Sequence, residues 1–350
     1  MKLIALAGQT GEWLRGAGPE SEIVLSSRIR LARNLADQPF PEWAAPAQRR
    51  AVLETVEAAV GRSKFLKNAL VLRMSDLSEM EQLFLVERHL ISRDHARQPE
   101  GKGVVISDRE ILSIMINEED HLRLQVLQSG LNLSEAWAML RRIDEELEKE
   151  LPLAFDSVWG YLTACPTNVG TGMRVSAMLH LPCLVMTRQI NRVIHAITKL
   201  GLTARGFYGE GTEASGNFFQ LSNQVSIGVG EEELLDSLGR IVTQVVGQER
   251  AARQALIGHS KAALEDRVFR ALGTLKSAQL ISSQEAIDRL SMVRLGVDLG
   301  LIPTLQREGV NRLLVQIQPA HLQMLEGRVL TPAERDARRA RLLRESLSAS

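Results

Sequence analysis

The pattern of apolar and polar positions divides the chain into a mixed N-terminal part and a helical C-terminal part. Short apolar runs bounded by glycine, proline or polar turns predict strands, and they alternate with stretches of helical periodicity. From Glu231 onward only the helical pattern remains. We therefore expect an α+β fold with a domain boundary near residue 250, which separates residues 1–250 from a helical domain at 251–350.

The individual elements follow from the same pattern and from turn residues. Strands are expected at 23–31, 104–106, 111–116, 158–162 and 202–208, and a hairpin at 218–227 that turns at Ser222-Asn223. Helices are expected at 46–60, 76–91, 133–150, 184–200, 231–257, 260–272, 283–290, 309–317 and 331–347.

Composition limits the class of protein. The chain has 350 residues, 45% of them hydrophobic, which suits one large or two ordinary domains with buried cores. Its 42 basic and 42 acidic side chains cancel, so charge-based binding must be local and no general attraction to nucleic acid or membrane is expected. With two cysteines, no CxxC pair, no signal-peptide pattern and no membrane-length apolar run, we expect a cytoplasmic protein.

A glycine-rich loop at 165–174, with the sequence CPTNVGTGMR, is the first candidate for chemistry. Pro166 disfavours helix before it, and Gly170 and Gly172 allow tight backbone turns. Backbone N–H groups of such a loop can hold an anion while Arg174 binds it as a fork. An ordinary tight turn with a surface arginine is the alternative, because glycine-rich loops are common.

Arg28 and Arg30 lie in the strand expected at 23–31. Because side chains alternate between the two faces of a strand, both arginines share a face and repel each other unless an anion lies between them. A polyphosphate fits this arrangement. A solvated sheet edge with two unrelated arginines is equally compatible with the spacing.

The last strand of the first predicted hairpin runs into the charged stretch NEEDHLR at 117–123. If the extended conformation continues, Asn117, Glu119, His121 and Arg123 project on one side, and the arginine keeps the nearby carboxylate ionised and oriented. The alternative is a charged loop tip.

Two further segments carry candidate groups. The stretch GEGTEA at 209–214 formally fits GxGxxA, but no helical pattern follows it, so we expect a glycine-flanked loop that bears Glu210 and follows Arg205. The chain contains no GxxxxGK[ST] and is therefore not a P-loop protein. His89 is more typical of a core or cap histidine than of a ligand.

The last expected helix, at 331–347, is rich in arginine. Arg335 and Arg339 are one turn apart, and Asp336 is a neighbour of Arg339 on the helix surface. Such a set could hold a ligand with a cationic and an anionic end. A solvated basic helix is the alternative.

Several of these weak signals point to one site. Arginines at positions 28, 30, 123, 174 and 205 all lie on or beside strand ends and loops. Guanidinium groups gathered around a nucleoside triphosphate would position it and neutralise the transferred group. Each charged hydrogen bond contributes roughly 1.5–3 kcal/mol, so the loss of two or three arginines would end catalysis.

Four motifs in this order resemble the ATP:guanidino phosphotransferases, and most closely the bacterial protein arginine kinases. They are SSRIR at 26–30, NEEDHLR at 117–123, CPTNVGTG at 165–172 and the segment 205–210. The resemblance implies a guanidino-kinase catalytic domain at 1–250, with an antiparallel sheet flanked by helices, and a C-terminal helical domain. That subfamily lacks the N-terminal helical domain of creatine and arginine kinases, and only about twenty residues precede the first arginine strand here.

The resemblance also implies roles for individual residues. Catalytic roles fall on Glu119 and Glu210, which grip the acceptor guanidinium, with Cys165 close by. Contacts with ATP fall on Ser26, Ser27, Arg28, Ile29, Arg30, His89, Arg123, Arg174, Val175, Ser176, Ala177, Met178, Arg205, Gly206, Phe207, Tyr208, Gly209 and Glu210. An allosteric phosphoarginine site with the motif RDxxRA falls on Arg335, Asp336, Arg338, Arg339 and Ala340. The family usually reads Arg-Ala-Ser-Val where this chain reads RVSA at 174–177, a change that we expect to affect packing rather than chemistry.

The implied reaction transfers the γ-phosphoryl group of ATP to arginine side chains of proteins and marks them for degradation in a stress response. A guanidinium with a pKa above about 12 is a poor nucleophile, so a carboxylate, here Glu119, must take a proton while Glu210 orients the second nitrogen. Cys165 as a thiolate would balance the substrate cation. Mg²⁺ is expected to arrive with ATP, without a protein-held metal site.

Two alternative functions stay open. One is a phosphagen kinase for a free guanidino metabolite, which the missing N-terminal domain disfavours; the other is a non-catalytic adaptor that binds phosphoarginine, which the complete catalytic set disfavours. The resemblance further implies a homodimer and, as partners, protein substrates with exposed arginines, a stress-response repressor, a zinc-containing activator and an AAA+ unfoldase–protease. No membrane or direct nucleic-acid binding is expected.

Overall fold

The computed structural model describes residues 3–206 and 215–348. Within these ranges an eight-stranded sheet has the order β2-β3-β4-β5-β1-β8-β10-β9, and its neighbouring strands pair antiparallel. Its strands are β1 (Val24–Arg33), β2 (Leu70–Arg73), β3 (Gly103–Ile106), β4 (Leu112–Ile116), β5 (Leu122–Ser129), β8 (Met173–His180), β9 (Leu202–Gly206) and β10 (Phe218–Asn223). A separate small hairpin consists of β6 (Phe155–Asp156) and β7 (Gly160–Tyr161).

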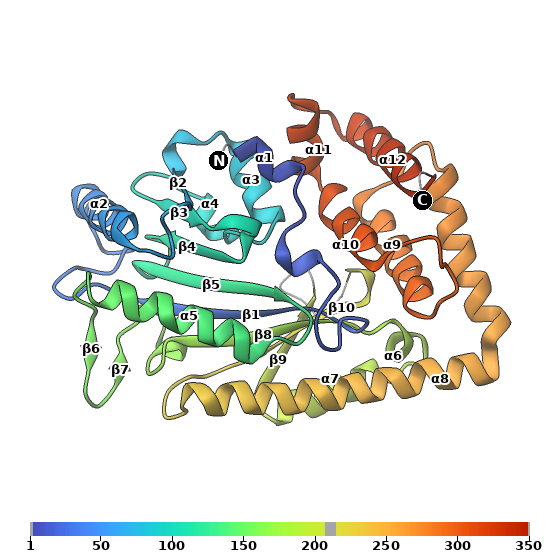
Figure 1. Ribbon diagram of the computed structural model, residues 1–350, viewed down its shortest axis with the longest axis horizontal. Coiled ribbons are helices and arrows are strands. Elements are labelled where there is room, and N and C mark those ends of the chain that lie inside the picture. The colour runs from blue at the N-terminus through green and yellow to red at the C-terminus, as the bar shows by residue number, and fades with distance from the viewer. Residues whose placement is uncertain (1–2, 207–214, 349–350) are drawn as a thin grey trace.

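Helices surround the sheet and extend beyond one end of it (Figure 1). They are α1 (Leu3–Ala7), α2 (Pro46–Arg62), α3 (Glu79–Glu87), α4 (Arg93–Ala96), α5 (Leu133–Glu148), α6 (Pro182–Met186), α7 (Ile190–Lys199), α8 (Glu231–Ser277), α9 (Ser283–Asp298), α10 (Arg307–Gln316), α11 (Pro319–Glu326) and α12 (Pro332–Ser348). Figure 1 shows α9 to α12 gathered at one side, next to the second half of α8.

The main core lies on one face of the sheet. Inward side chains of the central strands, such as Ile29, Val126 and Val175, are buried with the apolar faces of α2, α5 and the first half of α8. Because side chains alternate along each strand, the polar side chains between them point to the opposite face. That opposite face carries the candidate site.

The C-terminal helices are fastened to the segment that precedes β1. Arg294 of α9 is fully buried, and its guanidinium donates to the carbonyl oxygens of Ser21 (2.8 Å) and Glu22 (3.2 Å). Trp13, in the short 3-10 helix η1 (Glu12–Leu14), belongs to the same core cluster as the inner faces of α9 and α10. The helical region therefore also supports one wall of the site.

Most elements that the hydrophobic pattern predicts are present. β1, the β3–β4 hairpin, α2, α5 and α12 lie within a few residues of their expected bounds. The pattern misses the strands β2, β5, β6 and β8 and the helices α1, α4 and α11. The two helices expected at 231–257 and 260–272 form the single helix α8, which is interrupted at Ser260 (φ −145°), so residue 250 lies inside a helix.

The structure decides one open alternative and contradicts two local predictions. The stretch 117–121 is a charged turn and does not continue as a strand: Asn117 has φ +60°, and the chain returns as β5. The helix expected at 184–200 is broken into α6 and α7 at Arg188, whose φ of +60° ends a helix in the manner of a left-handed cap. The hairpin expected at 218–227 does not form, because β10 ends at Asn223 and pairs with β8 and β9 instead.

Candidate active site

The polar face of the sheet lines a cavity of about 590 Å³. The five arginines singled out from the sequence all line it, although they come from four strands: Arg28, Arg30, Arg123, Arg174 and Arg205. Strand register brings them together, since Arg30 lies opposite Arg174 in β8 and Arg123 lies opposite Ala32 at the far end of β1. The cavity is strongly cationic as a result.

The arginines are close enough to perturb one another. Burial, followed by the charges of Arg123 and Arg174, lowers the pKa of Arg28 to about 10. Burial and the neighbouring Arg28 lower the pKa of Arg30 well below its usual value. The Nε atoms of Arg30 and Arg174 are buried and have no hydrogen-bond partner among the described residues. Unsatisfied guanidinium donors in a cluster of like charge favour an anionic ligand.

Glu118, rather than Glu119, binds the arginine of this stretch. A carboxylate oxygen of Glu118 lies 2.5 Å from Nη1 of Arg123, and the other accepts the hydroxyl of Ser92. Burial raises the pKa of Glu118, but Arg123 and Ser92 outweigh it and bring the pKa to about 2. The turn at Asn117 explains why Glu118 and not Glu119 pairs with Arg123, because side chains alternate between two faces only in an extended strand.

Glu119 follows Glu118 in the turn between β4 and β5 and lies beside the glycine-rich loop at 165–174. Its carboxylate hydrogen-bonds with Cys165, and burial together with Asp120 and Glu118 raises its pKa. The loop is tied to the same acidic turn, because the N–H of Ala164 donates to Asp120 Oδ1 at 2.7 Å. A carboxylate whose proton affinity is raised is suited to accept a proton from a nearby nucleophile.

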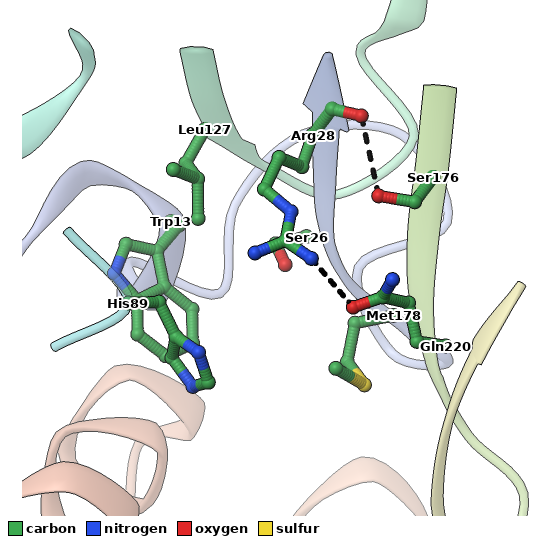
Figure 2. A pocket seen from close by; sticks show the side chains of 8 residues that line it. All are labelled: Trp13, Ser26, Arg28, His89, Leu127, Ser176, Met178 and Gln220. Carbon is green, nitrogen blue, oxygen red and sulfur yellow. Dashed lines mark hydrogen bonds between the residues drawn. The ribbon is translucent and has the colours of Figure 1, made fainter. Parts of the chain in front are cut away.

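A second, narrow cavity of about 20 Å³ adjoins the arginines (Figure 2). Trp13 and His89 lie on one side of Arg28 there, with ring centroids 5.2 Å apart and nearly perpendicular planes, and Gln220 lies on the other. Gln220 Oε1 accepts a hydrogen bond of 2.7 Å from Arg28 Nη2. The other residues that line this narrow cavity are Ser26, Leu127, Ser176 and Met178. A cavity of this volume has room for about one water molecule, so these side chains form a packed wall behind Arg28.

Four of the other predicted ATP contacts have side chains that line neither cavity. The side chains of Ile29, Val175 and Ala177 are in the core on the opposite face, as strand alternation requires. Ser27 is buried and donates its hydroxyl to the carbonyl oxygen of Gly130 at 2.7 Å. Gly206 lines the large cavity, whereas Phe207, Tyr208, Gly209 and Glu210 lie outside the described residues.

The C-terminal arginine motif is partly committed to holding α12 in place. Arg339 is buried; its Nη1 donates to Asp336 Oδ1 at 2.6 Å and its Nε to the carbonyl oxygen of Ile317 at 2.8 Å. Arg338 pairs with Glu326, and Ala340 is in the core. Arg335 and Asp336 are half-buried.

Sequence reasoning missed many of the side chains that line the two cavities, among them Trp13, Gln220, Arg93 and Arg97. Trp13 and Gln220 carry no local signal, because each reaches the site only through packing or strand pairing. Arg93 and Arg97, at the mouth of the large cavity, lie on or beside the short helix α4, which was not expected. A charged helix turn next to a predicted nucleotide site could have drawn attention to them.

Within the described ranges, His, Cys, Asp and Glu side chains nowhere gather in a group of three or more that could hold a metal ion. Nor does any helix in those ranges combine the length and the apolar character that crossing a membrane requires.

Comparison with known proteins gives a consistent result along the whole chain. The family model for the ATP:guanido phosphotransferase C-terminal catalytic domain matches residues 51–252, and that for the protein-arginine kinase McsB C-terminal domain matches residues 261–350. The protein-arginine kinase of Symbiobacterium thermophilum is 50% identical over 340 residues, covering 96% of each chain. That of Brevibacillus brevis is 49% identical over 337 residues, covering 96% of this chain and 94% of its own.

Solved structures share the fold. A lombricine kinase superposes with a TM-score of 0.60 at 24% identity and covers 71% of each chain. The duplicated taurocyamine kinase of Schistosoma mansoni, solved with transition-state-analogue components, has a TM-score of 0.61 at 20% identity and covers 81% of this chain and 47% of its own.

Proposed function

The chain belongs to the ATP:guanido phosphotransferases and, among them, to the protein-arginine kinases, and on this premise we propose that it transfers the γ-phosphoryl group of ATP to arginine side chains of proteins. One observation carries the proposal for the site. A single cavity on the polar face of the sheet is lined by five arginines. The carboxylate of Glu119, whose pKa is raised, lies in the turn between β4 and β5 of the same sheet.

The arginine cluster binds and neutralises the triphosphate. Arg28, Arg30 and Arg174 point into the cavity from adjacent strands, and their mutual repulsion is relieved when phosphate oxygens lie between them. A cluster that is rigid before the nucleotide arrives needs little reorganisation during transfer. His89 lines the large cavity as well as the narrow one, and we propose that it contacts the nucleotide.

Glu119 acts as the general base on the acceptor. The guanidinium nitrogen forms a bond to the γ-phosphorus as the bond to the ADP oxygen breaks, and the nitrogen proton passes to the Glu119 carboxylate. The raised pKa of Glu119 strengthens it as a proton acceptor. Cys165, hydrogen-bonded to Glu119, holds that carboxylate in place, and Glu210 is proposed to orient the second guanidinium nitrogen.

Mg²⁺ is proposed to enter with ATP. The side chains described here do not fit a protein-held metal site. The carboxylate of Glu118 is already bound by Arg123 and Ser92, and the charged side chains that line the large cavity are mostly cationic. Phosphate oxygens and water are the ligands that Mg²⁺ ordinarily keeps in kinase sites.

The variant Glu119→Gln tests this proposal. It should bind ATP like the wild type but lose most phosphoryl transfer to a protein substrate, by about a hundredfold or more, because general-base catalysis contributes on that scale. Glu232→Gln, an exposed acid at the start of α8, is the matched control and should behave as wild type. Phosphoarginine formation is followed by mass spectrometry under non-acidic conditions. Full activity of Glu119→Gln would refute the base assignment, and transfer to free L-arginine alone would favour a phosphagen kinase.

Finer features of the function rest on the subfamily resemblance. We propose that residues 1–250 form the catalytic domain and 251–350 a helical domain in which Arg335, Asp336, Arg338, Arg339 and Ala340 bind phosphoarginine and regulate the kinase. We also propose a homodimer that works in the cytoplasm during stress, with a repressor, a zinc-containing activator and an AAA+ unfoldase–protease as partners. The half-buried Arg335 supports the regulatory site, because it lies at the surface of α12 one turn from the Asp336–Arg339 ion pair.

A further inference from the structure

The β6–β7 hairpin exposes large apolar side chains. Val158 is 80% exposed, Phe155 59% and Trp159 55%. The hairpin projects from the body of the molecule, at the lower left of Figure 1. Neighbouring exposed apolar groups of this size usually mark a surface that binds another molecule.

The tip of the hairpin is ordered by its own hydrogen bonds. Asp156 Oδ1 accepts from the backbone N–H groups of Val158 (2.8 Å) and Trp159 (2.9 Å), and these bonds lower the pKa of Asp156. An aspartate that closes a turn in this way fixes the residues that follow it. The apolar side chains are therefore presented in a defined arrangement rather than on a loose loop.

The base of the hairpin is anchored to the sheet. The Arg33 guanidinium lies 3.5 Å from the centre of the Tyr161 ring, and the ring of Phe155 meets that ring edge-on at 5.2 Å. The Tyr161 N–H donates to the carbonyl oxygen of Gly170 at 2.8 Å, within the glycine-rich loop. Gly160 packs so closely against Gly170 that a Cβ would lie 2.6 Å from its oxygen. The hairpin and the loop thus form one structural unit.

This unit leads directly to the acceptor end of the candidate active site. Leu162 follows β7, and its carbonyl oxygen accepts from Asn34 Nδ2 at 3.0 Å. Asn34 also donates to Asp120 Oδ1 at 2.6 Å, next to Glu119. Three residues beyond Leu162, Cys165 hydrogen-bonds with Glu119. The chain that leaves the hairpin therefore runs to the carboxylate that we propose as the base, and a polypeptide bound there can extend toward the hairpin.

The charge around the hairpin suits a basic segment. Glu148 accepts from the Tyr161 hydroxyl at 3.4 Å, and Asp156 lies at the turn. Neither carboxylate forms an ion pair within residues 3–206 and 215–348. An arginine-bearing segment that also carries apolar residues complements this surface in charge and in hydrophobicity.

We propose that the β6–β7 hairpin docks the polypeptide that flanks the target arginine, through Phe155, Val158 and Trp159. This inference rests on the proposed function and adds its substrate class: extended or unfolded segments with an apolar residue near the arginine. A free guanidino compound is too small to span the active site and the hairpin, so the hairpin contributes to the modification of proteins and not to that of a short peptide.

The double variant Val158→Ser/Trp159→Ser tests the inference, because both side chains are exposed and the contacts that anchor the hairpin are made by Phe155, Gly160 and Tyr161. Its matched control is Phe269→Ser/Leu280→Ser, two apolar residues that are 49% and 65% exposed in the C-terminal region. KM is measured for reduced carboxymethylated lysozyme and for the peptide acetyl-Gly-Arg-Gly-amide, with ATP saturating. We expect the hairpin variant to raise KM for the unfolded protein about tenfold, the effect of one or two central interface side chains, and to leave KM for the peptide unchanged. A separate titration of ATP at a fixed peptide concentration should give the wild-type KM for ATP.

Several outcomes would overturn the docking role of the β6–β7 hairpin. Equal KM values for hairpin variant, control and wild type on the protein substrate remove the docking role, and a parallel rise on the short peptide points to damage of the active site instead. A hairpin variant that elutes as a smaller species in size-exclusion chromatography identifies the surface as an interface between copies. If the wild type modifies neither substrate, the proposed function fails by itself. Fluorescence anisotropy of labelled carboxymethylated lysozyme then still tests docking, and equal Kd values for wild type and variant refute it.

Discussion

Replacing Glu118 by Gln removes the charge that balances Arg123 while preserving the shape of the side chain. In the folded protein Glu118 has a side chain that is only 5% exposed, lies 2.5 Å from Arg123 Nη1 and also accepts from Ser92. The amide of the variant can accept only one of these hydrogen bonds and leaves Arg123 among the other cations of the cavity. Removing one partner of a buried ion pair is strongly destabilising for this reason.

The pKa of Glu118 sets the size of the effect. The folded-state pKa of about 2, against an unfolded value of 4.5, corresponds to about 3 kcal/mol of stabilisation at neutral pH. An unfolding entropy of about 2 cal/mol/K per residue, spread over 350 residues, converts this to a decrease in Tm of roughly 4–5 °C. Because the folded-state pKa is depressed, the stabilisation is present above pH 4.5 and is lost as the pH falls through 2.

Thermal unfolding of wild type and variant, followed by calorimetry between pH 3 and pH 7, checks both consequences. The gap in Tm should be widest near pH 7 and narrow as the solution is acidified. Glu57→Gln is the matched control, because Glu57 forms a similar pair with Arg73 at the surface, where ion pairs contribute little. A Tm change at Glu118 no larger than that at Glu57, or a gap that widens in acid, would refute the reasoning.

Two further changes test other parts of the structure. Gln220→Leu removes the acceptor of Arg28 Nη2 and should raise KM for ATP about tenfold, since hydrogen bonds to charged groups contribute about 1.5–3 kcal/mol; steady-state kinetics with an unchanged KM would contradict it. Glu87 accepts the backbone N–H groups of Ala320 and His321 (both 2.8 Å), and burial raises its pKa to about 7. The Glu87 carboxyl group therefore binds its proton more tightly in the folded than in the unfolded state. This proton binding stabilises the folded state by about 3 kcal/mol below pH 4.5, and the stabilisation is lost as the pH rises through 7. Glu87→Gln should flatten that part of the stability profile measured by urea unfolding, and an unaltered slope would show that another group is responsible.

The sequence by itself determined the local features of this protein. Alternation along β1 is a property of any strand, so the shared face of Arg28 and Arg30 follows from their spacing alone. Helical periodicity likewise predicted α2, α5 and α12 close to their bounds. The order of four short motifs was sufficient to indicate the guanidino-phosphotransferase family, which the comparisons confirm.

Only the tertiary structure decided which of these residues meet and what they bind. The positive φ of Asn117 decides that Glu118 and not Glu119 pairs with Arg123. Asparagine tolerates a left-handed backbone better than most residues, but the sequence does not show which asparagine adopts it. Gln220 reaches Arg28 because β8 lies between β1 and β10, a strand order that no local pattern contains. Propensity and periodicity act over a few residues, whereas sheet order and helix packing join segments hundreds of residues apart, and those long-range contacts give the arginine-lined cavity its shape.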